Sequence, residues 1–534
     1  MSTHTTLLEY VPHLRAELAA FVALWSQPNG GIDTEHGGFC CGLDYNGTRL
    51  VGNKYVWFNG RGIWVWSCCA HRAVARAALG EAEAVVGEEG HSSAAALREV
   101  ARRTIAWVDR CGRDADGGWI VETDASGETV LREAEPRIIA TSGYGAAFFA
   151  EGLVEWSAAL AANSTSDVGD DAVAEPQRRA LAILRDFVAL ADDETRPGDP
   201  GWPAVYDGMR SLGHHMIALN LCRQLLEVTR VLPDEDIVEL EALSSRMVNA
   251  VMGPFFHPEF GLICEILDHD YVRRTTDRNE DLCYLGHSIE TLWMVMAESR
   301  RRKMKIATTA VGDALYRQRR DADALLALAA LRFRRHVDVA TDRVYGGTLR
   351  ALHVRTHAYF LDGDAKVKWA HDEVMVGCLL IVEHARDLAW VAEELEREER
   401  EEEEEEEEEE RSAASPWWTA LREGDVGGGD EGGSRSSMRG LQSIVQWAMD
   451  QFEETSRYVH ANFSLRHYGY GGGWRVGGDR TMLPKPPNAL PGYSMGCKTL
   501  PNRMEHYHHP RHLILCLESL AAIERMQTTP FKRN

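Results

Sequence analysis

The sequence predicts an all-α protein folded as an (α/α)6 barrel, in which six helical hairpins close into a ring. Two observations carry this prediction. Apolar residues recur at helical spacing through most of the 534 residues, and a short loop rich in glycine and aromatic residues returns six times, mostly at intervals near 80 residues. A unit of two helices and such a loop cannot bury its own apolar face, so neighbouring units must cover it. Six units suffice for closure, with the loops gathered at one end as small β-hairpins around a cleft. An open helical solenoid is the alternative, but one closed domain accounts better for the length.

The individual helices are predicted from apolar residues spaced three and four apart. The N-terminal stretch, residues 1–21, has the pattern of a first amphipathic helix. Further clear examples are LREVARRTIAWVDRC (97–111), HMIALNLCRQLLEVTRVL (215–232), GHSIETLWMVMAES (286–299) and HDEVMVGCLLIVEHARDLAWV (371–391).

The six recurring loops combine glycines and aromatic residues with a few β-type residues. They are GGFCCGLDYNG from Gly37, GGWIVETDASG from Gly117, GWPAVYDG from Gly201, FGLICEILD from Phe260, YGGTLRALH from Tyr345 and GYGGGWRVGG from Gly469. The last interval is the longest because it contains an acidic run and the segment DVGGGDEGGSRSS.

The acidic run accounts for much of the protein's charge. The formal net charge is −24, and between Glu393 and Arg411 there are 15 glutamates against three arginines, a net −12. The remaining mild acidity argues against nucleic acid and anionic membranes as partners. Within a single domain of residues 1–534, we expect residues 391–437 to be a disordered insertion, helical at most at its start because glutamate favours helices. A tolerated loop expansion is preferred here to a regulatory or partner-binding role.

The compartment is predicted from the termini and the cysteines. The N-terminus lacks a basic start followed by an apolar run, and no apolar stretch is long enough to cross a bilayer. The eleven cysteines show no CxxC spacing and no regular framework, which is typical of reduced, buried thiols. The sequence therefore predicts a soluble cytoplasmic protein.

Two candidate sites pair ionisable residues with aromatic or helical surroundings. Arg61 ends the segment KYVWFNGR and could bind sugar or carbonyl oxygens through its guanidinium, or form a structural ion pair. His287 and Glu290 are three residues apart at a predicted helix start and so share one face. Histidine exchanges protons near neutral pH and the glutamate could orient it, although a histidine there is more often a cap or core residue.

Two further clusters lie nearer the C-terminus. Trp369, His371 and Glu373 alternate before an apolar helix, as expected of a loop at a barrel mouth. The segment HYHHPRH (506–512) is dense in histidine, but it lacks zinc-ligand spacing. A single acid/base histidine, with Arg511 holding substrate or a carboxylate, is preferred to a metal site. His215 begins another predicted inner helix, where it could line the pocket or pack in the core.

Taken together, these segments resemble the N-acylglucosamine 2-epimerase family. The resemblance is carried by KYVWFNGR (54–61), by GHSIE (286–290), by WAHDEVM (369–375) and by YHHPR (507–511), in the family's order. It covers roughly residues 20–390 and 440–525. One departure is His506, which stands where the N-acetylhexosamine members have a cysteine, and it bears on the identity of the sugar more than on the reaction.

The resemblance implies an (α/α)6 barrel and an interconversion of N-acetylglucosamine and N-acetylmannosamine. His287 and His508 would be the catalytic pair, exchanging a proton at C2 of the ring-opened sugar. Arg61, Glu290 and Glu373 would line the sugar site, with Trp369 and His371 as neighbours. No metal or other cofactor is expected, ATP would be an allosteric activator rather than a substrate, and a homodimer is expected from the family alone.

Three alternatives remain open at this point. A cellobiose or mannose 2-epimerase, or an aldose–ketose isomerase, would use the same histidines. A glycoside hydrolase on the same type of barrel would use Glu290 and Glu373 as its two carboxylates, but it leaves the histidines unexplained. A non-enzymatic protein acting through its acidic loop would not require His287, His508 and Arg61.

Overall fold

The computed structural model shows how the predicted helices assemble. The structure describes residues 7–40, 42–43, 48–83, 93–129, 143–162, 170–196, 207–228, 231–273, 281–309, 312–358, 366–404, 415–424, 434–463 and 506–528. Of the six predicted loops, the one from Gly469 and most of the one from Gly201 lie outside these residues.

An inner ring of six helices forms the barrel wall. Its members are α3 (Val56–His71), α7 (Tyr144–Ala162), α9 (Leu212–Val228), α11 (Leu285–Thr309), α13 (Lys368–Glu383) and α17 (His508–Thr528). Each helix packs against the next in this order, and α17 returns to α3, so the ring is closed. The closure excludes the open solenoid.

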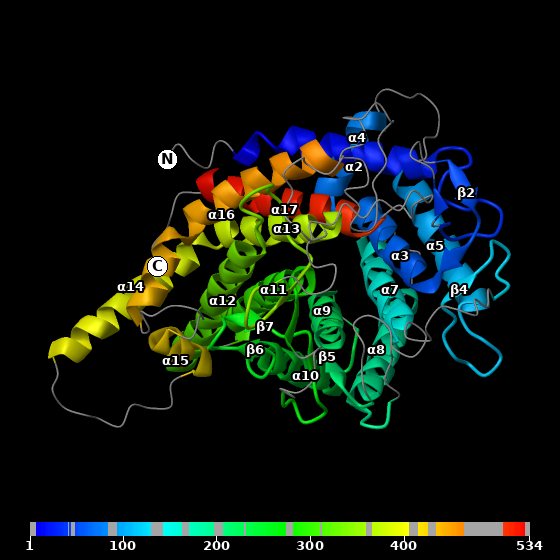
Figure 1. The fold of residues 1–534 in the computed structure, drawn as a ribbon. Helices are drawn as coiled ribbons and strands as arrows, with labels where there is room; N and C mark the ends of the chain where they lie inside the picture. The colour runs from blue at the N-terminus through cyan, green and yellow to red at the C-terminus, as the bar shows by residue number, and fades with distance from the viewer. Residues whose placement is uncertain are drawn as a thin grey trace.

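A second layer of helices covers the ring from outside. It consists of α2 (Val11–Ser26), α5 (Ala94–Cys111), α8 (Asp170–Asp192), α10 (Asp234–Met252), α12 (Gly312–Ala340) and α16 (Ser434–Phe463), with α4 (Ala73–Glu83), α14 (Ala385–Glu404) and α15 (Pro416–Glu423) in addition. Figure 1 shows α2, in blue, beside α17, in red, where the two ends of the chain complete the barrel. The predicted all-α (α/α)6 barrel is confirmed.

Short antiparallel strands mark one end of the barrel. The pairs are β1 (Gly42–Leu43) with β2 (Arg49–Val51), β3 (Lys54–Tyr55) with β4 (Glu122–Thr123), β5 (Arg210–Ser211) with β8 (Ile266–Leu267), β6 (Phe256–His257) with β7 (Leu262–Ile263), and β9 (Leu282–Tyr284) with β10 (Ala351–His353). Because β3, β5 and β9 run directly into α3, α9 and α11, the hairpins surround the N-terminal ends of the inner helices.

Two buried lysines hold the hairpin loops in place. Lys54 donates to Asp33 Oδ2 at 2.7 Å and to the carbonyl oxygens of Gly37 and Ala125 at 2.7 and 2.8 Å, so it joins two successive loops. Lys366 repeats the arrangement with Asp342, at 2.5 Å. A buried ammonium needs such partners, and the lysine of KYVWFNGR is therefore structural.

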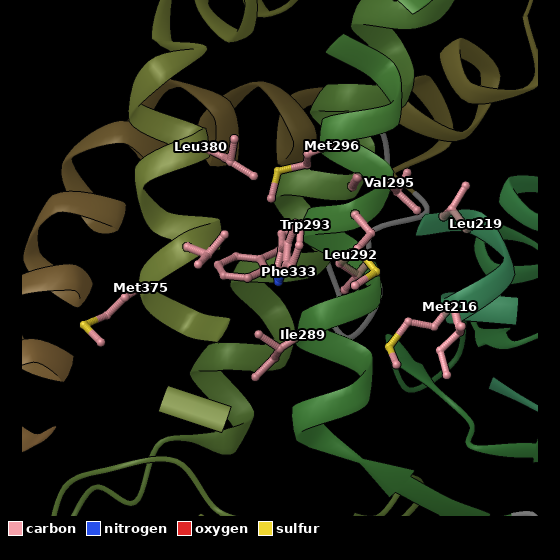
Figure 2. Close-up of a cluster of buried hydrophobic side chains, with 14 of the residues drawn as sticks. Met216, Leu219, Ile289, Leu292, Trp293, Val295, Met296, Phe333, Met375 and Leu380 are labelled. Carbon is pink, nitrogen blue, oxygen red and sulfur yellow. The ribbon is translucent and has the colours of Figure 1, made fainter. Parts of the chain in front are cut away.

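The core fills the space between the two helical layers. Figure 2 shows part of it, where Ile289, Trp293 and Met296 of α11 lie among side chains from α9, α12 and α13. The described cysteines are buried and form no disulfide, as expected of reduced thiols. Among the described residues, no helix has the length and apolar character needed to cross a membrane.

Parts of the predicted insertion, residues 391–437, are helical. Helix α14 continues to Glu404, with Val391 and Leu395 buried on its inner face, and α15 buries Trp418 and Leu421. These apolar residues explain why both flanks of the acidic run pack on the barrel. Residues 405–414 and 425–433 lie outside the described residues.

Candidate active site

The first turns of α11, α13 and α17 bring two histidines to one tryptophan. The ring of His287, the third residue of α11, lies 5.7 Å from the ring of Trp369, and the ring of His508, the first residue of α17, lies 5.2 Å from it. The ring of Tyr284 contacts both of these neighbours, at 4.5 Å from the His287 ring and 5.8 Å from the Trp369 ring. Residues more than 200 positions apart in the sequence thus share one cluster at the hairpin end.

His287 is held by a carboxylate. Its Nδ1 lies 3.0 Å from Glu265 Oε1, and its side chain is 29% exposed. Burial lowers the pKa of His287, but the negative charge and hydrogen bond of Glu265, with a smaller contribution from Glu290, outweigh it and leave the pKa raised above 6.5. With Nδ1–H donating to Glu265, Nε2 is the nitrogen that can accept a proton; it makes no hydrogen bond with any described residue.

Sequence reasoning missed Glu265. It lies between β7 and β8, is 4% exposed, and its Oε2 has no hydrogen-bond partner among the described residues. The available signal was a lone carboxylate inside the apolar segment FGLICEILD, where a buried charge requires a partner or a function.

His508 is held by a larger ionic cluster. Its Nδ1 lies 2.8 Å from Glu373 Oε1, and the same oxygen accepts from Arg511 Nη2 at 2.6 Å. Arg511 Nη2 also donates to Glu290 Oε1 at 2.5 Å, and Trp293 Nε1 donates to Glu373 Oε2 at 2.7 Å. All the charged members are at least nine-tenths buried, so the cluster fixes Glu373 tightly against His508.

Arg511 was expected to hold substrate or a carboxylate, and the structure places it against two carboxylates, Glu290 and Glu373. These carboxylates and His508 lie close enough together to share a cation, and the guanidinium of Arg511 is in contact with all three. This guanidinium supplies positive charge to the cluster from within the protein.

Arg61 is a further buried cation of the predicted site. It is 9% exposed and makes no ion pair with any described residue, and its Nε has no hydrogen-bond partner there. Its guanidinium lies over three rings, 3.9 Å from Phe148, 4.8 Å from Tyr507 and 5.0 Å from Trp57. The positive charge of Arg61 acts to lower the pKa of His287, so the two groups interact electrostatically. A buried cation supported mainly by aromatic faces is well suited to an anionic ligand oxygen.

Close packing explains why two of these motifs contain a glycine. A Cβ at Gly286 would lie 2.2 Å from the Trp369 ring, so only glycine lets this ring pack beside His287. A Cβ at Gly60 would lie 2.4 Å from the backbone nitrogen of Phe149, so glycine allows α3 and α7 to cross closely and sets Arg61 over Phe148.

Two predicted site histidines are engaged elsewhere. His371 Nε2 accepts from the Thr348 amide at 2.8 Å, its Nδ1 donates to the Val367 carbonyl oxygen at 2.7 Å, and its ring stacks on Tyr458. His215 likewise uses Nδ1 on the Ser211 carbonyl oxygen and Nε2 on the Tyr271 hydroxyl. Because both nitrogens of each ring are bonded within the protein, the structure gives no support to their prediction as substrate-binding residues.

His506, the departure from the family pattern, also packs inside. Its Nε2 lies 2.5 Å from the Phe58 carbonyl oxygen and its ring stacks on Phe39 and Phe58. Burial lowers its pKa to about 3, so it is neutral at physiological pH.

Comparison with known proteins bears on the fold. No protein-family model matches the sequence, and no curated protein matches it. Solved structures match over nearly the whole chain. A sugar epimerase from a ruminal bacterium aligns with a TM-score of 0.55 at 12% identity, covering 95% of this chain and 98% of that one. Cellobiose 2-epimerase from Bacillus thermoamylovorans gives 0.55 at 13%, covering 96% and 99%.

A D-mannose isomerase aligns similarly, with a TM-score of 0.52 at 12% identity, covering 96% of this chain and 97% of that one. Such low identities establish a shared fold and nothing finer. The chain thus has the barrel of these proteins, and its chemistry must be argued from its own residues.

Proposed function

We propose that the protein is a carbohydrate epimerase or isomerase that moves a proton on the carbon beside the carbonyl of a ring-opened sugar. One observation carries the proposal. His287 and His508 lie against the same indole, and each has its Nδ1 beside a buried carboxylate. Two histidines oriented in this way can direct Nε2 toward one substrate.

In this mechanism the carbonyl of the open sugar acidifies the C2–H bond. One histidine, neutral, takes the C2 proton through Nε2, and the other, protonated, returns a proton to the opposite face. Glu265 and Glu373 fix the tautomers and stabilise each imidazolium as it forms. In the reverse direction the two histidines exchange the roles of base and acid, while each stays on its own face of the substrate.

Proton removal leaves an enediolate with negative charge on the former carbonyl oxygen. Arg61 is the proposed partner of that oxygen, because its charge acts on the pKa of His287 and it makes no ion pair with any described carboxylate. In the proposed site, Trp369 is the surface on which the substrate lies, while Glu290 and Arg511 keep Glu373 in place.

We propose N-acetylglucosamine and N-acetylmannosamine as the substrate pair, on the strength of the KYVWFNGR segment. Cellobiose or mannose epimerisation, or aldose–ketose isomerisation, is the second candidate, favoured by the solved structures of the same fold, which include a cellobiose 2-epimerase and a D-mannose isomerase. The aldose–ketose reaction needs the same first proton removal, with the proton returned at C1.

The arrangement of the carboxylates speaks against a hydrolase that uses Glu290 and Glu373. A glycosidase needs one carboxylic acid with a raised pKa and a second carboxylate about 5 Å or more away. Here both carboxylates contact the same Arg511 nitrogen, at 2.5 and 2.6 Å, so they are held together by one buried cation and leave no room for a sugar between them.

The test is solvent exchange followed by NMR. The purified protein is incubated with N-acetylmannosamine in deuterium oxide, with and without ATP, because we retain nucleotide activation as a proposal. We expect N-acetylglucosamine carrying deuterium at C2, and loss of this product in His287→Asn and His508→Asn. Exchange on mannose or cellobiose alone would move the substrate and keep the mechanism. No exchange on any of these sugars would refute the proposal.

A further inference from the structure

Three side chains that can ligate a metal ion meet on the outside of the barrel, where α2 and α16 lie against each other. His13 and Glu17 are four residues apart on α2, so they share one face of that helix. His460, in the last turn of α16, completes the group. Each residue offers one ligand atom, and the three atoms lie within 4.8 Å of one another. The group belongs to the outer layer of helices and shares no residue with the candidate active site.

Aromatic contacts hold the two helices together beside this group. The ring of Tyr10, at the N-terminal cap of α2, lies 5.2 Å from the ring of Phe452 of α16 in an edge-to-face contact. The rings of His13 and His460 are 5.9 Å apart. Figure 1 shows α16, in orange, against α2, in blue. The backbones that carry the ligands are therefore in position before an ion binds, which favours binding because little new order has to be created.

The separation of the ligand atoms suits a zinc ion. His13 Nε2 lies 3.4 Å from Glu17 Oε1, which is longer than a good hydrogen bond. Two ligand atoms held at zinc–ligand distances around a tetrahedral ion are about 3.4 Å apart, so this pair already has the separation that one ion requires. The His460 side chain is exposed, and rotation of its ring can bring a nitrogen to the same separation.

Glu17 is backed by the protein on one side and open to solvent on the other. Its side chain is 20% exposed, and its Oε2 lies 3.9 Å from Nε2 of the buried His509 of α17. Its other oxygen, Oε1, is the one nearest to His13. Because the His13 side chain is 48% exposed, water can reach the outer side of the group and take the fourth position on an ion.

We propose that His13, Glu17 and His460 form a binding site for Zn²⁺ that joins α2 to α16. Two imidazole nitrogens and one carboxylate oxygen are ligands that zinc prefers, whereas Ca²⁺ and Mg²⁺ favour oxygen ligands alone. A surface ion pair between His13 and Glu17 accounts for two of these residues and does not require the third. The ligand set therefore favours the metal over a simple ion pair.

An ion at this site ties together the two outer helices that support the His508 side of the barrel. Helix α2 packs on α17, which carries His508, and α16 packs on α13, which carries Glu373. An ion that binds only the folded chain stabilises it. Since none of the three ligands belongs to the candidate active site, the ion is a clasp between helices and takes no part in the proposed proton transfer.

The test is a metal titration of the full chain. Zinc chloride is added to the metal-free protein at neutral pH and binding is followed by calorimetry. We expect one tight equivalent of zinc, whose Kd rises about 100-fold in His13→Ala and in His460→Ala, because the loss of even an indirect partner of a ligand costs 10–100-fold in affinity. A parallel titration with Co²⁺ reports the ligand type, since its absorption spectrum separates nitrogen and oxygen ligands from cysteine thiolates.

His269→Ala is the matched control. His269 is a partly exposed histidine that lies 3.8 Å from one carboxylate, Glu194, and it belongs to no such group of three ligands among the residues that the structure describes. This variant should keep the Kd of wild type. Zinc should raise the Tm of wild type and of His269→Ala, but leave the Tm of His13→Ala and His460→Ala unchanged, with circular dichroism showing that all four proteins are folded.

Three results would overturn the proposal. The first is the absence of a tight equivalent of zinc, or a Kd that stays the same in both His13→Ala and His460→Ala, as binding to the acidic run alone would give. The second is a Co²⁺ spectrum dominated by thiolate ligands, which would move the site to the cysteines. The third is displacement of zinc by an equal concentration of Ca²⁺, which would overturn the ligand class.

Discussion

The two histidines of the candidate site differ in how they are held. His287 has one carboxylate partner, Glu265, whose second oxygen makes no hydrogen bond with the described residues, and its side chain is 29% exposed. His508 is 7% exposed and its partner Glu373 is shared with Arg511, which also binds Glu290. The first pair is a simple hydrogen-bonded couple, whereas the second is part of a buried ionic network.

The two carboxylate partners therefore have different effects: Glu265 acts mainly on the pKa of its histidine, and Glu373 acts mainly on the position of its histidine. At His287, Glu265 sets the pKa of the histidine, because it is the nearest ionised group. At His508, the charges of the network compensate one another, because Arg511 pairs with two carboxylates. Removing one member therefore leaves a buried charge without compensation. We therefore expect changes near His287 to move the pH dependence, and changes near His508 to affect stability as well.

The largest effect is expected from removing either histidine. His287→Asn and His508→Asn should each lower kcat for epimerisation by about 10³-fold, the usual contribution of an acid/base group. The remaining histidine can still take a proton from its own face and return deuterium there. Each variant should thus exchange C2 hydrogen of one epimer only, and opposite epimers for the two variants, as followed by NMR. Loss of exchange with both epimers in both variants would contradict the two-base mechanism.

The next effect tests the network around His508. Glu373→Gln removes a carboxylate that accepts from Arg511 and Trp293, so it should lower the free energy of unfolding by roughly 3 kcal/mol. Urea denaturation monitored by circular dichroism measures this change. Glu265→Gln is the matched comparison: Glu265 pairs with a partly exposed histidine and should cost clearly less. Equal losses of unfolding free energy in the two variants would mean that Glu373 and Glu265 contribute equally to stability, against the proposed difference.

A smaller effect is expected on the pH profile of Glu265→Gln. The negative charge of Glu265 raises the pKa of His287, and its removal lets that pKa fall, so imidazolium is lost at lower pH. The bell-shaped profile of kcat/KM should move to lower pH, and maximal activity should drop about 10- to 100-fold from the lost charged hydrogen bond. The equilibrium constant fixes the ratio of kcat/KM in the two directions, so both must shift equally. A profile that keeps its position would remove Glu265 from the role of charge partner.

The sequence predicted the barrel and brought the right segments together, because helical periodicity and recurring glycine loops report on the backbone. It suggested His287, His508 and Arg61 as candidate site residues through short motifs. Without the family resemblance carried by those motifs, periodicity alone does not distinguish these histidines from His215 and His371, since all four lie in the first turn of an inner helix. The distinction lies in partners that are distant in the chain, such as Glu265 for His287 and the Thr348 amide for His371.

Residues 391–437, predicted as a disordered insertion, include packed helices for a related reason. Composition alone makes residues 391–437 look unstructured, but Trp418 and Leu421 find an apolar surface on the barrel. A low-complexity pattern describes a segment without its neighbours, and two buried side chains are enough to hold a short helix such as α15 against the barrel.

The smallest effect on activity is expected at His371, and it tests whether partner geometry identifies the site. In His371→Asn the side-chain NH2 group can replace Nδ1 as the donor to the Val367 carbonyl oxygen. It cannot reach the backbone N–H of Thr348, which in the wild type donates to His371 Nε2. The unsatisfied buried N–H should lower the free energy of unfolding by about 2 kcal/mol. Because no ring nitrogen of His371 is available to substrate, kcat should stay within about twofold of wild type. Urea denaturation and the C2 exchange assay measure the two quantities on one preparation. A fall in kcat comparable to that of His508→Asn would place His371 in the catalytic machinery and break the distinction between bonded and catalytic histidines.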